Sequence, residues 1–123
     1  MSSRIRILVA EDEELVRFVI VEALKEAGFA VMHAEHAEAA LAVLQLYGAR
    51  IHVLFTDIQM PGTMDGVALA HHTAKNWPKI ALLITSARPR PDRTGLPQKS
   101  RFLAKPYQHH QLIRHISELA AVT

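Results

Sequence analysis

The sequence predicts an α/β fold in which five parallel strands form one doubly wound sheet with helices on both faces. Two observations lead to this prediction. Short apolar runs alternate with longer amphipathic segments along the chain, which is the pattern of parallel strands joined by helical crossovers. The chain has 123 residues and 50% of them are apolar, so it is long enough for one domain with its own core.

The first half of the chain contains two strand–helix pairs. Residues 5–10 (IRILVA) predict a buried strand, and residues 13–27 predict a helix closed by Gly28. Residues 29–33 predict a second strand and residues 37–47 a second helix. The first helix carries apolar residues at helical spacing, which we expect to face the sheet: Val16, Val19, Ile20, Ala23, Leu24 and Ala27.

The second half adds three strands and two helices. The strands are expected at 51–56 (IHVLFT), 80–85 (IALLIT) and 101–104, and the helices at 65–76 and 108–121. The helix at 65–76 stops before Trp77-Pro78, because the residue that precedes a proline disfavours helical geometry. We expect Trp77 to be a packing residue at this helix end.

Residues 86–100 (SARPRPDRTGLPQKS) interrupt the alternation. They include three prolines and one glycine without apolar periodicity, and a proline inside a helix costs about 3 kcal/mol. We therefore expect a mobile loop with at most one short turn in place of a full helix. A basic cluster in this region is interpreted as part of a solvated loop: Arg88, Arg90, Arg93, Lys99 and Arg101.

Candidate site residues, most of them polar, stand at the carboxyl ends of four predicted strands. They are Glu11 and Asp12 after the first strand, Asp57 after the third, Thr85 and Ser86 at the fourth, and Lys105 and Pro106 after the fifth. Each has an ordinary explanation when taken alone, such as a carboxylate at a helix start. Because parallel strands end side by side, and ligands bind beyond these ends, the group is expected to converge on one site.

Such a site has a definite chemistry. Carboxylates that share a crevice repel each other unless a cation or bound protons compensate their charge. Oxygen ligands favour a hard cation such as Mg²⁺ or Mn²⁺, and a carboxylate beside such a cation can attack a phosphoryl group. Lys105 would neutralise the phosphoryl oxygens, the Thr85 hydroxyl could donate a hydrogen bond to one of them, and the small Ser86 would leave the approach open.

The segments ILVAEDEELVR, FTDIQMPG, MDG, LLITSA and FLAKPY together resemble the receiver domain of bacterial two-component response regulators, over essentially the whole chain. The resemblance implies a flavodoxin-like sheet with strand order 2-1-3-4-5, in which the helix between strands 4 and 5 is shortened or replaced by a loop. It also implies a signalling domain that accepts a phosphoryl group and switches conformation, and that catalyses only its own phosphorylation and dephosphorylation.

The matching motif positions imply a role for each site residue. Asp57 would be the phosphoacceptor, and Glu11, Asp12, Asp57 and the backbone carbonyl of Gln59 would bind Mg²⁺ (or Mn²⁺), with no other cofactor. Lys105 would bind the phosphoryl group. Thr85 and Phe102 would be the switch pair, and the family often has a cis peptide at the position of Lys105-Pro106, which X-Pro chemistry permits.

Three features depart from the family pattern. Glu11 stands where aspartate is commoner, so it is expected to reach the metal through water. The segment MPGTMDG has one residue more than the usual MPGMDG, which should alter the loop beside the site. Residues 86–100 replace the helix that commonly belongs to the output surface. In its combination of the long MPGTMDG loop with the segments LP and RFLAKPY, the chain is similar to receivers that are attached to hybrid kinases or stand alone.

Three alternatives remain open at this stage. A receiver that is never phosphorylated would serve only as a docking module. A phosphatase of the haloacid dehalogenase type also uses an aspartyl phosphate, but it needs an acid where this chain has Gln59. A flavodoxin-like cofactor binder would need a phosphate loop rich in donors after the first strand, whereas this chain has four successive carboxylates at 11–14.

The resemblance makes a histidine kinase or a histidine phosphotransfer protein the expected phosphoryl donor. Phe18 and Val21, beside the apolar stripe of the first helix, are either part of a docking patch or ordinary, partly exposed residues. We expect no direct nucleic-acid or membrane partner, a cytoplasmic location, and one receiver domain over 1–123 without an output domain in this chain. The oligomeric state stays open.

Overall fold

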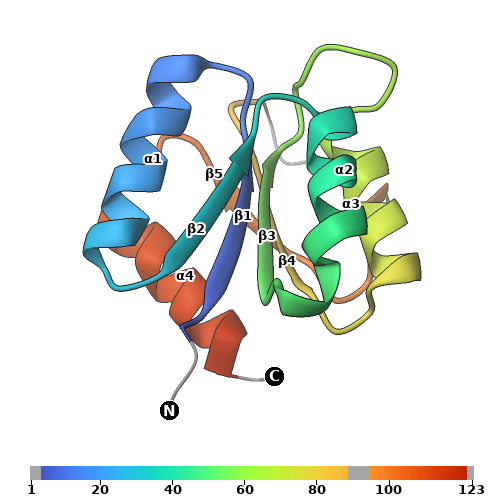
Figure 1. The fold of residues 1–123 in the computed structure, drawn as a ribbon. Helices are drawn as coiled ribbons and strands as arrows, with labels where there is room; N and C mark the ends of the chain where they lie inside the picture. Colours follow the sequence, from blue (N-terminus) through green and yellow to red (C-terminus); the bar gives the residue numbers. More distant parts are fainter. Residues whose placement is uncertain (1–3, 89–94, 122–123) are drawn as a thin grey trace.

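The structure is a computed structural model that describes residues 4–88 and 95–121. Within these ranges, five strands and four α-helices follow one another in the order expected for a doubly wound fold, and strand and helix alternate except between β4 and β5 (Figure 1). Their bounds are β1 Arg6–Ala10, α1 Glu14–Glu26, β2 Ala30–Ala34, α2 Ala37–Tyr47, β3 Val53–Asp57, α3 Gly66–Asn76, β4 Ala81–Ser86, β5 Arg101–Ala104 and α4 His109–Ala121, with a short 3₁₀ helix at Gly48–Arg50.

The strands form one sheet in the order β2-β1-β3-β4-β5, and every neighbouring pair is parallel. Helices α1 and α4 cover one face of the sheet, and α2 and α3 cover the other (Figure 1). This arrangement confirms the predicted fold class and strand order. All strands end at the same edge of the sheet, at the top of Figure 1.

The sheet separates two apolar cores because side chains alternate between its faces. On β1, Leu8 and Ala10 belong to the core under α2 and α3, whereas Ile7 and Val9 belong to the core under α1 and α4. All four are at most 1% exposed. Strands buried on both faces explain why the sequence shows continuous apolar runs here rather than an alternation with polar residues.

The third and fourth strands both begin and end later in the chain than predicted, and each ends one residue later. Strand β3 includes Asp57 because Asp57 pairs with Thr85 and the Ile58 N–H donates to the Thr85 carbonyl at 2.9 Å, and β4 includes Ser86 because Ser86 pairs with Ala104 on β5. Asp57 therefore lies within the sheet rather than in the turn after it. The pairing with β4 therefore holds the backbone of Asp57 in place.

Helix α1 is rotated relative to the predicted apolar stripe. Ile20 and Leu24 are buried as expected, but Val19 is 41% exposed and Val21 is only 4% exposed. The expectation that Val21 contributes to an exposed patch is therefore wrong. Apolar residues surround much of this helix, so packing against the sheet, rather than their spacing, decides which of them are buried.

Trp77 directly follows α3, and its indole ring lies against Gly48 at the end of α2. A Cβ atom at Gly48 would come within 2.3 Å of the indole Nε1. The ring also packs against the core under α2 and α3. The absence of a side chain at Gly48 thus lets the ends of the two helices come together, and the prediction of Trp77 as a packing residue is confirmed.

The segment between β4 and β5 is anchored at its carboxyl end. The described residues here, 87–88 and 95–100, contain no α-helix, as predicted. However, Leu96 is buried in the core under α2 and α3, and the Gly95 carbonyl lies 2.9 Å from His71 Nε2. The expectation of a mobile loop is therefore wrong for residues 95–100.

The basic cluster is dispersed rather than a single solvated loop. Arg88 and Lys99 are exposed, as expected. Arg101 instead belongs to β5, and its Nη1 donates to Glu118 Oε1 on α4 at 2.7 Å. Arg90 and Arg93 lie outside the described residues. Of the helices in the described ranges, none has both the length and the apolar character to cross a membrane.

Candidate functional site

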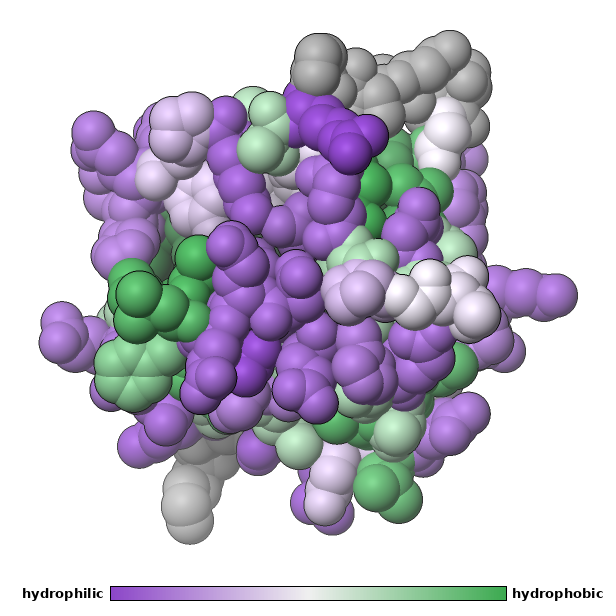
Figure 2. Space-filling model, turned by 90° about the horizontal axis from the view of Figure 1, so that it is seen from above, coloured by the Kyte–Doolittle hydropathy of each residue, from purple (hydrophilic) through white to green (hydrophobic). Residues whose placement is uncertain are grey.

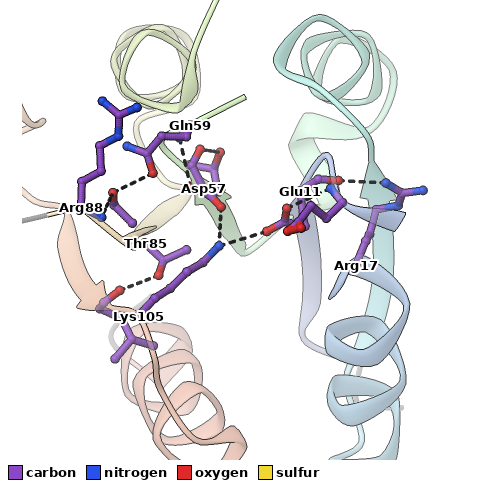
Figure 3. Close-up of polar contacts among 11 residues, drawn as sticks. Glu11, Arg17, Asp57, Gln59, Thr85, Arg88 and Lys105 are labelled. Carbon is purple, nitrogen blue, oxygen red and sulfur yellow. Dashed lines mark hydrogen bonds and ion pairs between the residues drawn. The ribbon is translucent and has the colours of Figure 1, made fainter. Parts of the chain in front are cut away.

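Asp57 lies at the carboxyl end of the central strand β3, with only 5% of its surface exposed. Both oxygens of its carboxylate accept a hydrogen bond (Figure 3). Lys105 Nζ donates to Oδ2 at 2.5 Å, and the backbone N–H of Gln59 donates to Oδ1 at 3.1 Å. The carboxylate is thus held in one orientation by the charged Lys105 side chain after β5 and by the backbone of the turn that follows β3.

Glu11 shares Lys105 with Asp57. It follows β1, is 2% exposed, and places its Oε1 at 3.5 Å from Lys105 Nζ. Its Oε2 accepts the Glu13 N–H at 3.0 Å, and its backbone carbonyl accepts from Arg17 Nη1 at 2.9 Å. The start of α1 therefore fixes Glu11, and one lysine faces two buried carboxylates.

The protonation equilibria reflect this imbalance. Burial raises the pKa of Glu11 above its usual value; the Glu13 N–H and Lys105 oppose this effect, and the negative charge of Asp57 adds to it. Partial burial lowers the pKa of Lys105, but the hydrogen bond and charge of Asp57, together with Glu11, outweigh burial and raise it overall. Lys105 is thus a stable cation, while the negative charge of Glu11 is not fully compensated.

The chemistry of these donors fits a hard divalent cation only in part. Glu11 and Asp57 offer two adjacent carboxylates, and their excess negative charge suits a cation with oxygen ligands. Asp12, by contrast, is exposed and lines an adjoining open cleft together with Gln59, Asp65 and Arg88. Within residues 4–88 and 95–121, no three acidic or histidine side chains are grouped as a metal site. Asp12 would have to turn inward to join the other two.

Thr85 pairs with Asp57 across β3 and β4, whereas Phe102 lies on β5 and pairs with Ile84. Thr85 is 1% exposed, and its hydroxyl donates to the Leu103 carbonyl on β5 at 2.6 Å (Figure 3). Phe102 is partly buried and packs against the core under α2 and α3. The Thr85 hydroxyl is therefore bonded to the neighbouring strand and directed away from Asp57.

Ser86 and Pro106 complete the residues expected at the site. The Ser86 hydroxyl donates to Gln59 Oε1 at 2.8 Å, so the Gln59 side chain is tied to β4. The Lys105–Pro106 peptide bond is cis.

The structure adds two residues that sequence reasoning did not single out. Arg17 holds the Glu11 carbonyl from the next turn of α1. Tyr107 packs edge-on against Phe55 with ring centroids 6.0 Å apart, and burial, followed by the charges of Glu11 and Asp57, raises its pKa. Only the position of Tyr107, two residues after Lys105, could have suggested a role for it.

An apolar surface lies next to the acidic edge. Figure 2, which views that edge from above, shows a mainly hydrophilic face with a hydrophobic patch on the side of α1. The exposed apolar residues of α1 are Leu15, Phe18 and Val19, which are 75%, 61% and 41% exposed. A groove between α1 and the segment after β5 is lined by Leu15, Val19, Pro106 and Tyr107, among others. Phe18 is thus exposed as the sequence suggested, but its exposed apolar neighbours on α1 are Leu15 and Val19 rather than Val21.

Sequence comparison places this geometry among known proteins. The profile of the family described as response regulator receiver domain matches residues 7–117. The response regulator receiver protein CpdR of Brucella abortus (strain 2308) is 31% identical over 118 residues, which cover 93% of this chain and 95% of that protein. The sensor kinase CckA of the same organism is 30% identical over 122 residues, which cover 97% of this chain but 13% of the kinase.

Solved structures show the same fold. A response regulator receiver protein from Sinorhizobium medicae WSM419 has a TM-score of 0.89 at 27% identity, covering 97% of this chain and 96% of that chain. The receiver domain of the hybrid histidine kinase CckA has a TM-score of 0.79 at 29% identity, covering 94% and 98%. The chain therefore belongs to the response regulator receiver domain family of two-component signal transduction.

Proposed function

We propose that this chain accepts a phosphoryl group on Asp57 from a phosphohistidine of a histidine kinase or phosphotransfer protein, in a reaction that depends on Mg²⁺. The observation that carries the proposal is the Asp57 carboxylate. It is almost fully buried, oriented by Lys105 and the Gln59 N–H, and located beside Glu11 at the carboxyl edge of the sheet. A purely structural aspartate would not need a second buried carboxylate next to it.

In the proposed reaction an oxygen of Asp57 attacks phosphorus. A bond forms between this oxygen and phosphorus, and the bond between phosphorus and the donor imidazole nitrogen breaks. The imidazole leaves with the electron pair and takes up a proton from solvent. Lys105 stays protonated, because its pKa is raised, and its charge stabilises the phosphoryl oxygens in the transition state.

Glu11, Asp12, Asp57 and the backbone carbonyl of Gln59 are the proposed ligands of the divalent cation. When bound, Mg²⁺ would compensate the carboxylates and neutralise phosphoryl oxygens. Glu11 is already held next to Asp57 by the Glu13 N–H. Asp12 is exposed and lines the adjoining cleft together with Gln59, so its side chain would have to turn inward to join them.

The exposed face of α1 is the proposed docking surface for the phosphoryl donor. Leu15 and Phe18 are both more than half exposed, and they lie near the start of the helix, close to the acidic edge. Burial of such residues is a common source of binding energy in protein interfaces. A partner bound there would have its histidine near Asp57.

Phosphorylation is proposed to switch the chain through Thr85 and Phe102. To reach a phosphoryl oxygen, the Thr85 hydroxyl must give up its 2.6 Å hydrogen bond to the Leu103 carbonyl. The movement would loosen β5 next to Phe102, and Phe102 would then turn further inward. This is a shift between two packings of one fold.

The test is the mass of the intact protein after incubation with acetyl phosphate and Mg²⁺. We expect the mass of one phosphoryl group to be added, and no addition without Mg²⁺ or in Asp57→Asn. If the wild type gains no mass and also fails to bind beryllofluoride, the proposed phosphoacceptor role is refuted. A domain that only docks partners would then be the better description.

A further inference from the structure

Ser86 connects β4 to the turn after β3 through its hydroxyl group. The oxygen accepts the Arg88 N–H at 3.1 Å, and the hydroxyl proton is donated to Gln59 Oε1 at 2.8 Å. Ser86 is 1% exposed, so its end of both bonds is shielded from competing water. The Gln59 side chain is therefore held by a buried anchor rather than by solvent.

The hydrogen bonds fix the orientation of the Gln59 amide. Because the buried hydroxyl proton needs an acceptor, the amide oxygen must face Ser86, and the amide nitrogen faces away from it. In Figure 3 the Gln59 side chain extends towards Arg88 and away from the Asp57 carboxylate. The backbone N–H of the same residue nevertheless contacts Asp57 Oδ1 at 3.1 Å. Gln59 thus approaches Asp57 with its backbone only.

This separation matters because Asp57 has few free acceptor positions. A carboxylate offers about four lone pairs, and Lys105 and the Gln59 N–H already occupy one position on each oxygen. A released Gln59 amide carries two N–H donors next to a pair of buried carboxylates, which attract such donors. A third hydrogen bond to Asp57 would weaken its oxygens as nucleophiles and cover the face that the phosphoryl group must approach.

We propose that Ser86 is a positioning residue for the phosphorylation of Asp57. Its hydroxyl holds the Gln59 amide at the side of the cleft and so keeps the reactive face of the carboxylate open. The inference rests on the proposed function of Asp57. It gives the hydroxyl of Ser86 a role that its small size alone would not require, since alanine would be equally small.

The test is the rate of mass gain with acetyl phosphate and Mg²⁺ in four proteins: wild type, Ser86→Ala, Gln59→Ala and the double variant. Ser86→Ala should slow phosphorylation by about three- to tenfold, which is the effect of one misplaced hydrogen bond. In the Gln59→Ala background the same substitution should have no effect, because no amide remains to be released. Thermal unfolding of each variant measures whether the fold is retained.

The two possible failures can be distinguished. If the wild type gains no mass, the proposed function fails, and this inference fails with it. If the wild type reacts but Ser86→Ala reacts equally fast, only the inference is refuted. It is also refuted if Ser86→Ala slows the reaction equally in both backgrounds, because Ser86 would then act on the strand itself and not through Gln59.

Discussion

Gly66 provides a sharp test of how closely α3 packs against β3, the strand that ends at Asp57. It is the first residue of α3, is buried, and donates its N–H to the Ile58 carbonyl at 3.0 Å. A Cβ atom at this position would come within 1.9 Å of the Asp57 backbone oxygen and 2.8 Å of Ile58 Cα. Both contacts are with backbone, so rotation of a side chain cannot relieve them.

We therefore expect Gly66→Ala to force a backbone shift. The helix or the strand end must move by about 1 Å before the contact becomes tolerable, and overpacking of this kind costs about 3 kcal/mol. With a denaturant slope of about 1.5 kcal/mol per molar, the urea midpoint should fall by about 2 M. Because Asp57 itself is displaced, the variant should also react more slowly with acetyl phosphate.

Two other glycines serve as controls in the same urea series. Gly95→Ala meets no atom within 4 Å and should change the free energy of unfolding by less than about 0.5 kcal/mol. Gly28→Ala also meets no atom, but its φ of 101° is left-handed and should cost about 1 kcal/mol. Unfolding is followed by circular dichroism. If Gly66→Ala unfolds at the same urea concentration as Gly95→Ala, the close approach of α3 to the Asp57 backbone is refuted.

Three further predictions concern other parts of the fold. On α2, Leu44→Ala removes a fully buried side chain and should lower the free energy of unfolding in urea by about 2–5 kcal/mol. The control is Leu46→Ala, at a site that is 77% exposed, which should change it by less than about 0.5 kcal/mol. Glu38 accepts hydrogen bonds from both the N–H and the hydroxyl of Thr63, which anchors the MPGTMDG loop. Glu38→Ala should therefore increase the rate of amide hydrogen exchange at Thr63 several-fold, as measured by NMR. An unchanged exchange rate would contradict this anchoring. Burial, followed by the charges of two arginines, lowers the pKa of His115 below its usual value of 6.5. The unfolded chain therefore binds more protons than the folded chain just below pH 6.5, and the free energy of unfolding falls as the pH falls there. In His115→Gln, the loss of unfolding free energy between about pH 7 and pH 5 should be smaller than in the wild type.

The sequence was sufficient for the sheet and for most of the site because both depend on chain order. Parallel strands with right-handed crossovers bring their carboxyl ends together whatever the details of packing. Asp57, Glu11 and Lys105 therefore meet as expected. The motif that identifies the family also fixes the strand end at which each of them lies.

Details that depend on side-chain orientation could not be predicted. The burial of Val21 and exposure of Val19 follow from how α1 is rotated against the sheet, which its apolar spacing leaves undetermined. Asp12 points to the adjoining cleft, although the chain places it next to Glu11. Leu96 is buried although its proline-rich surroundings indicated a mobile loop. In each case a tertiary contact, rather than a local preference, decides the outcome.

The contact between Trp77 and Gly48 has a consequence for optical experiments. Trp77 is the chain's single tryptophan, and it precedes β4, so it lies at the amino-terminal edge of the sheet, opposite the edge of Asp57. Its intrinsic fluorescence should report whether the ends of α2 and α3 remain together. The emission should therefore change strongly on unfolding and little on phosphorylation, which gives a stability signal that is insensitive to the state of the acidic site.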